Sequence, residues 1–156
     1  MAALSDYLES GLLQHLFRGQ DFPKPSAIAI ALTSGVPLDK HTGATIPELP
    51  TGINGSGTGY SRILLDRTDV SGDSYWTFSS GNCNVSGCQH FVKNSGNRVF
   101  DTALLDWGWT SGLAILDSGV YGEGNLLMHA QLDNPRIIYE GDSVVFNSET
   151  LQISFK

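Results

Sequence analysis

The last third of the chain, residues 112–156, decides the fold, because apolar and polar residues alternate along it. The sequence reads LLMHAQL from Leu126 to Leu132, and the chain ends with LQISFK from Leu151 to Lys156. Successive side chains of a β-strand point to opposite faces of the sheet, so a period of two indicates strands with one buried face. The stretch predicts four short antiparallel strands. Residues that favour tight reversals separate them, at 118–119, 122–124, 134–135 and 140–142.

Upstream segments complete the predicted fold. At residues 28–33, three large apolar side chains share one face and alanines lie on the other, so a further element, such as the helix, can approach closely. More strand signals lie at 60–65, 75–78, 90–92 and 99–100, and a long loop rich in Gly and Pro spans 34–59. One N-terminal helix or arm occupies residues 1–20. We expect a single mainly β domain over 1–156, an antiparallel, jelly-roll-like β-sandwich with one N-terminal α-helix.

Composition narrows the possible partners. The 156 residues carry a formal net charge of -7, and the nine basic residues are scattered. Nucleic acids and anionic membranes attract clustered basic residues, so neither is an expected partner. No apolar run approaches about 20 residues, so no membrane-spanning helix is expected. The N-terminus lacks the basic start and apolar middle of a secretion signal.

The N-terminal helix carries an apolar stripe. Leu4, Leu8, Leu12 and Leu16 are spaced four residues apart, which places them on one helix face, and Leu13 joins nearly the same stripe. Ser5 is suited to cap the start of the helix, and Gly19 to end it. The stripe either packs on the sheet or contacts another subunit.

No motif for catalysis or for a cofactor is found. Cys83 and Cys88 lie in a polar loop and fit two free thiols, a local disulfide or, least well, a metal ligand pair. His129 is on the polar face of its strand, where an exposed or interface histidine is expected. The aspartates next to turns fit solvated turn residues better than a hydrolytic carboxylate pair. We therefore expect no catalytic residue, no metal and no cofactor.

Aromatic residues form the remaining candidate sites. Tyr75, Trp76, Trp107 and Trp109 come from segments next to loops. The alternation places Trp76 and Phe78 on one face, and Trp107 and Trp109 likewise share a face. Such pairs fit the core of a β-sandwich, or else a subunit interface or a platform on which a sugar stacks.

Short motifs at both ends of the sequence carry a likeness to a known family. In the first half they are ALSDYLE at residues 3–9, AIALT at 29–33 and Gly59-Tyr60-Ser61-Arg62. The strongest are LAILD at 113–117, GNLL at 124–127, Gly141-Asp142 and the final Leu-x-Ile strand. Together these motifs resemble a family of small bacteriophage virion proteins. These proteins are often labelled tail-fibre proteins, especially in phages of cyanobacteria, and they look like the β-sandwich cement proteins that decorate some capsids. Residues 66–101 carry none of the likeness.

The resemblance implies a structural component of the virion, made in the host cytoplasm and released by lysis. Its first implication is a homotrimeric capsid cement or decoration protein that binds copies of itself and the major capsid protein. The alternative is a receptor-binding module of a tail fibre or tailspike that recognises a host surface glycan. An enzyme such as a glycan hydrolase is a third reading. The candidate binding residues are Leu4, Leu8, Leu12, Tyr75, Trp76, Trp107 and Trp109.

Overall fold

A computed structural model describes residues 3–50, 55–65, 76–80 and 90–154. These residues form a mainly β protein with one helix, α1 (Asp6–Arg18), as the sequence predicts. The strands are β1 (Ala3–Leu4), β2 (Ile28–Thr33), β3 (Ile63–Leu65), β4 (Trp76–Ser80), β5 (His90–Asn94), β6 (Arg98–Val99), β7 (Gly108–Leu116), β8 (Leu126–Ile138), β9 (Val145–Phe146) and β10 (Gln152–Ser154).

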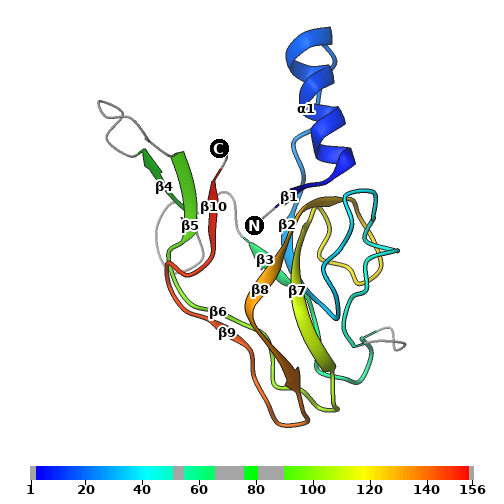
Figure 1. The fold of residues 1–156 in the computed structure, drawn as a ribbon, viewed down its shortest axis with the longest axis vertical. Coiled ribbons are helices and arrows are strands. Elements are labelled where there is room, and N and C mark those ends of the chain that lie inside the picture. The colour runs from blue at the N-terminus through cyan, green and yellow to red at the C-terminus, as the bar shows by residue number, and fades with distance from the viewer. Residues whose placement is uncertain (1–2, 51–54, 66–75, 81–89, 155–156) are drawn as a thin grey trace.

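All strand pairs are antiparallel. A five-stranded sheet has the order β1-β8-β7-β2-β3, a three-stranded sheet the order β10-β5-β4, and β6 pairs with β9. The pairs β7·β8, β6·β9 and β5·β10 are nested, so the C-terminal half is one long hairpin that folds over, in a jelly-roll-like manner (Figure 1). Helix α1 stands at one end of the molecule, opposite the connection between β8 and β9.

The main core lies between the large sheet and the smaller ones, as in a sandwich. Ile30 and Ile115 of the large sheet belong to it, and Trp76 of β4 and Ile153 of β10 pack against it. The alanine face of β2 is buried in a second cluster, together with Ile46 of the long loop. The loop, and not the helix, covers this face, because the small alanine side chains let the loop backbone approach the sheet.

The predicted reversal at Asn134-Pro135 is wrong, because β8 continues through it. In the β7–β8 register, Thr110 pairs with Arg136 and Gly112 with Gln131, so one residue of β7 faces four of β8. The proline therefore lies in a bulge, where a missing ladder hydrogen bond is tolerated. A second irregularity lies between Ile115 and Leu116 of β7.

The expectation that Trp107 and Trp109 share a face is also wrong. Gly108, between them, has φ +89, which breaks the alternation of an extended strand. Trp107 is 2% exposed and Trp109 is 51% exposed. The indole Nε1 of Trp107 donates to the Thr58 carbonyl at 2.9 Å, so this ring belongs to the core.

Helix α1 begins and ends as predicted. Ser5 caps it, because its Oγ accepts a hydrogen bond from the Leu8 amide at 3.2 Å. The same hydroxyl donates to the Leu126 carbonyl, which ties the start of the helix to β8. Gly19 ends the helix in the left-handed conformation, with φ 64.

Candidate interaction surfaces

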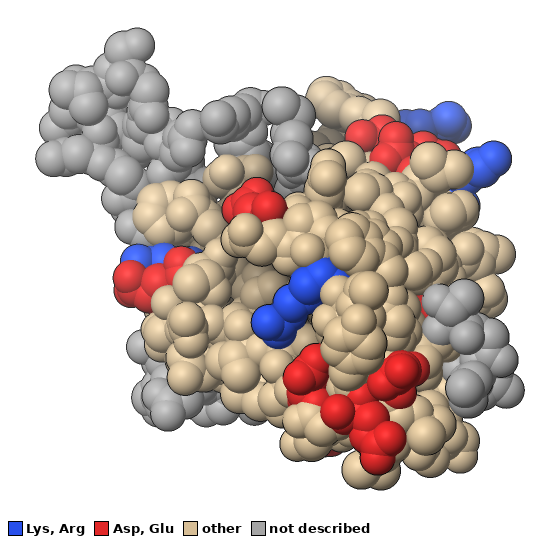
Figure 2. All heavy atoms as spheres, turned by 60° about the horizontal axis from the view of Figure 1, so that its bottom comes forward, with Lys and Arg blue, Asp and Glu red and all other residues tan. Residues whose placement is uncertain are grey.

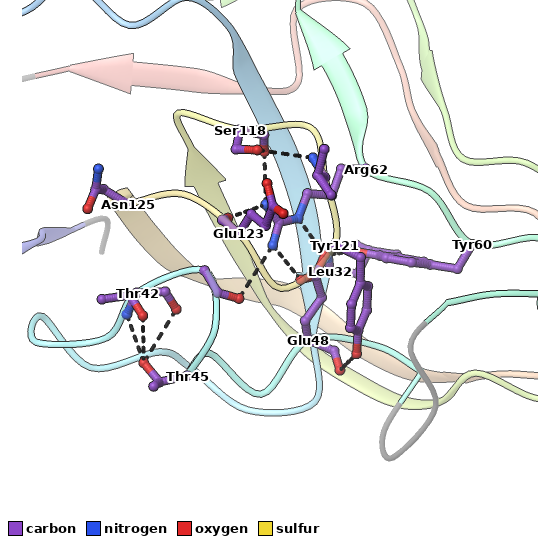
Figure 3. A network of polar contacts seen from close by, with 12 residues as sticks. Leu32, Thr42, Thr45, Glu48, Tyr60, Arg62, Ser118, Tyr121, Glu123 and Asn125 are labelled. Atoms are coloured by element: carbon purple, nitrogen blue, oxygen red, sulfur yellow. Dashed lines mark hydrogen bonds and ion pairs between the residues drawn. The ribbon is translucent and has the colours of Figure 1, made fainter.

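The densest polar cluster of the described residues is buried and joins three loops (Figure 3). Arg62 and Glu48 form a bidentate ion pair with both N–O distances at 2.7 Å, and their side chains are 0% and 2% exposed. The Arg62 guanidinium also donates to the carbonyls of Ser118 and Glu123, at 2.8 Å each. The N–H groups of this guanidinium therefore find their acceptors within the protein itself. The cluster holds the loops together and does not present a binding site.

Tyr60 extends this cluster into the large sheet. Its hydroxyl donates to Glu48 Oε1 at 3.1 Å and accepts from the Leu32 amide at 3.0 Å. Burial, and then the Glu48 carboxylate, raises the pKa of Tyr60 well above 10.0. The Gly-Tyr-x-Arg segment of the sequence is thus the anchor of the long loop, and its partner Glu48 lies within that loop.

The long loop is also fastened at its first half. Asp39 accepts a backbone hydrogen bond from Asp6 at 2.9 Å, and Gly43 donates to the Gly124 carbonyl at 2.8 Å. The predicted loop at 34–59 has no helix or strand among its described residues. These hydrogen bonds nevertheless attach it to other segments of the fold. It is therefore not a free binding loop in its described part.

His129 is buried, which corrects the expectation of an exposed or interface histidine. Its Nε2 lies 2.8 Å from Asp39 Oδ1, and it pairs across the sheet with Ala114 and Ala3. A His–Asp pair resembles a catalytic base with its orienting carboxylate. However, the other ring nitrogen, Nδ1, is shielded from solvent and has no hydrogen-bond partner in the described part of the chain. A substrate cannot reach that nitrogen, so the pair fastens the loop to β8.

The first part of the leucine stripe faces the protein's own core. Leu8 is buried, and Leu4 and Leu12 are half-buried against the main cluster. Leu8 and Leu12 thus hold the base of α1 on the sheet, whereas Leu4 lies in β1, which corrects its predicted place on a helix face. Of the aromatic candidates, Trp107 is buried, Trp76 is half-buried and Trp109 is exposed, while Tyr75 lies outside the described residues.

A different face of α1 is left uncovered. Leu13, Leu16 and Phe17 are 58%, 69% and 77% exposed, and their spacing places them on one side of the helix. We call these three residues the helix patch. The helix stands away from the sheets at this end (Figure 1), so the described part of the chain does not cover the patch. The prediction that Leu13 and Leu16 share the contact face of Leu8 is therefore wrong, because the apolar residues span more of the helix than one contact face can bury.

The returning chain covers yet another side of α1, which is why the helix patch stays free. Phe22 packs on Gly11, where a Cβ atom would lie 2.2 Å from the ring, and its centroid lies 5.7 Å from that of Tyr7. The core contact and this contact take two sides of the helix. Neither includes the helix patch.

A second exposed apolar surface lies on the outer face of β7 and β8. Trp109 and Ile137 are cross-strand partners, and Tyr139 follows with the same orientation, because Ile138 between them is buried. We call Trp109, Ile137 and Tyr139 the strand patch. Figure 2 shows a group of acidic side chains at the end of the molecule that is turned forward. Beside the strand patch, the Asp142 carboxylate accepts from the Tyr139 amide at 3.0 Å, and the Asp106 carboxylate accepts from the Glu140 amide at 2.8 Å.

The third feature is an open groove of about 530 Å³ between the layers, which we call the core groove. Half-buried apolar side chains form its walls, and exposed polar ones form its rim. The wall residues are Trp76, Met128, Leu132, Phe146, Leu151 and Ile153. Apolar walls inside a polar rim are typical of the central part of a protein–protein interface.

Neither metal nor membrane chemistry is indicated by the described residues. No group of three or more His, Cys, Asp or Glu side chains in that part of the chain is arranged to hold a metal ion. No helix among the described residues is long and apolar enough to cross a membrane. Cys83 and Cys88 lie outside the described residues, so their pairing stays a prediction.

Comparison with known proteins identifies the setting. A search of curated proteins finds no match. A family model described as "Podophage GP4 fiber I protein gp80" matches residues 3–154, nearly the whole chain. This agrees with the resemblance to phage virion proteins and supports a structural role in the virion. The chain belongs to the podophage GP4 fiber I protein gp80 family, a family of phage virion fibre proteins.

Proposed function

We propose that this protein is a non-enzymatic building block of a virion fibre, and that copies of it associate, three to an assembly, through the helix patch. The observation that carries the proposal is the free apolar face of α1. Large apolar side chains gathered on one helix face and rimmed by polar residues mark an interaction site.

Physical chemistry supports association at this face. Full burial of a Leu or Phe side chain stabilises by about 1.5–3 kcal/mol, and the helix patch holds three such side chains with most of their surface in water. Part of this gain is lost to the entropy of association, so the helix patch is expected to form the centre of a larger interface. The base of α1 is fixed by Ser5 and the leucine stripe, which presents the helix patch in one orientation.

The oligomeric mass of the purified protein tests the proposal. Light scattering after size exclusion, at several concentrations, is expected to give three chains for the wild type and one chain for Leu16→Asp/Phe17→Asp. Leu104→Asp/Leu105→Asp adds the same charge at two exposed leucines outside α1, which are 59% and 45% exposed, and should keep the wild-type mass. A wild type that stays monomeric at all concentrations, or a helix-patch variant that keeps its mass, would overturn the proposal.

The sequence also pointed to a capsid cement protein, and family membership favours the fibre over this role. Mass spectrometry of separated heads and tails decides between the two locations. If the protein is found on heads, particles that lack it should lose stability to heat and chelation. Unchanged stability of such particles would rule out cementing.

The strand patch supports a second candidate function, recognition of a host surface glycan. Exposed aromatic rings beside carboxylates offer both stacking and hydrogen bonds to a sugar. Tyr139 lies beside Asp142, and Asp106 accepts from the amide of the next residue, Glu140. Glycan-array binding that Trp109→Ala abolishes would support this function. An array without any binding would remove it.

A further inference from the structure

The helix patch and the core groove are complementary features of one chain. The first is a convex group of apolar side chains at the end of a projecting helix. The second is a concave surface with apolar walls, open to solvent, on a different part of the molecule. Helix α1 is fixed to β8 at its base by Ser5, so its outer end is free to meet another molecule.

The floor of the core groove is buried, but its apolar walls are partly exposed to water. Ile30, Leu113 and Ile115 of the large sheet reach it from below and are buried. The wall residues above them are only half-buried, although they pack against the main core. An apolar insert would remove these walls from water and would complete the packing between the two layers.

Charges at the two features are also complementary. Arg18 lies in the last turn of α1 and makes no ion pair among the described residues, and the rim of the core groove offers the exposed carboxylate of Asp133. The rim also carries Arg136, whose cation suits the negative end of a helix dipole. When the C-terminal end of α1 approaches the rim, Arg18 can pair with Asp133, and Arg136 can lie at the negative end of the helix dipole.

We propose that the helix patch of one copy inserts into the core groove of the next copy. This deepens the proposed function and rests on its self-association through α1. The contact joins two different surfaces, so it is heterologous: repeated, it closes into a ring, such as a trimer, or continues as an open fibre. An isologous contact between two helix patches would instead stop at a dimer, and three helix patches that met on a threefold axis would close a trimer without using the core groove.

A mixing experiment distinguishes these arrangements. Leu16→Asp/Phe17→Asp removes the insert and keeps the groove. Ala130→Trp fills the groove and keeps the insert, because Ala130 lines it and is half-buried. Each variant alone is expected to be monomeric. Mixed in equal amounts, they should form a complex of one chain of each. The intact helix patch of Ala130→Trp enters the intact groove of Leu16→Asp/Phe17→Asp, and the two altered surfaces left over cannot bind a further copy.

Controls protect the result against misfolding. Each variant should show the wild-type circular dichroism spectrum and cooperative melting. If Ala130→Trp does not fold, Leu132→Lys replaces it, since Leu132 lies in the bulge of β8, where the backbone tolerates change. Ile137→Lys, on the same strand but outside the groove, should keep the wild-type mass.

The outcomes separate this inference from the proposed function. A one-to-one complex from two monomeric variants supports the insertion. If the helix-patch variant is monomeric but groove variants keep the wild-type mass, or if the mixture stays monomeric, insertion is wrong while association through α1 stands. If Ile137→Lys dissociates the protein and groove variants do not, the interface is the strand patch. A monomeric wild type removes both proposals.

Discussion

Replacing Arg62 by methionine tests the claim that a buried ion pair holds the long loop. The change keeps much of the side-chain volume and removes the guanidinium. Glu48, with a side chain 2% exposed, is then left without the two hydrogen bonds of 2.7 Å that balance its charge. The carbonyls of Ser118 and Glu123 lose their donors at the same time.

The expected cost follows from this geometry. Removal of one partner from a buried ion pair destabilises by about 3–5 kcal/mol, because the other charge stays buried and unpaired. The orphaned carbonyls would add to this cost if they stayed dry, but their loops can relax toward water. For a chain of this length, about 1 kcal/mol lowers Tm by roughly 2–4 °C, so we expect Tm to fall by about 6–20 °C.

Thermal unfolding followed by circular dichroism measures the loss, with urea unfolding as a second measure of free energy. Lys40→Met is the control, since Lys40 is exposed and forms no ion pair among the described residues. It should change the free energy of unfolding by less than about 0.5 kcal/mol. If Arg62→Met melts within about 2 °C of the wild type, the reasoning about the loop anchor is wrong.

Three further changes probe the same fold by unfolding measurements. The raised pKa of Tyr60 means that the folded state keeps a proton that the unfolded state loses above about pH 10, so this contribution is full below pH 10 and is lost as pH rises toward the folded pKa. The stability advantage of the wild type over Tyr60→Phe should therefore shrink by about 1 kcal/mol from pH 8 to pH 11, and a constant difference would contradict the assignment. Gly43→Ala should cost about 1–3 kcal/mol, because its Cβ would lie 1.9 Å from the Glu123 carbonyl oxygen, whereas Gly35→Ala meets nothing within 4 Å and should be tolerated. Ser5→Ala should cost about 1–2 kcal/mol through the lost cap, and equal stability would show that the cap contributes nothing.

Local patterns predicted the regular elements well. The helix follows from Ser5, the leucine spacing and Gly19, all of which act within a few residues. The strand at residues 28–33 follows from alternation alone. These features depend on contacts that are short in sequence or on a single buried face, and a pattern of period two or four records such contacts directly.

Long-range geometry set the features that the patterns missed. The sequence predicts a turn at Pro135, because a bulge in β8 is defined by its register with β7 and leaves no separate mark in the sequence. Alternation predicts one face for Trp107 and Trp109, but the positive φ of Gly108 between them breaks the alternation. The sequence does not identify Glu48 as the partner of Arg62, since a buried pair joins segments without a fixed spacing.

The roles of the loop and the helix are the reverse of what composition suggests, and this has a physical cause. A loop rich in Gly and Pro is expected to be free for function, yet this one carries Glu48 and Ile46 and must cover the alanine face of the large sheet. A helix with a leucine stripe is expected to pack against the core along its length. A helix that stands on the end of the sheet can bury only its base. Leu16 and Phe17 lie beyond that base, and no segment in the described chain reaches them. The apolar side chains at the outer end of α1 can therefore be buried only against another molecule, because the helix extends past the sheet that buries its base.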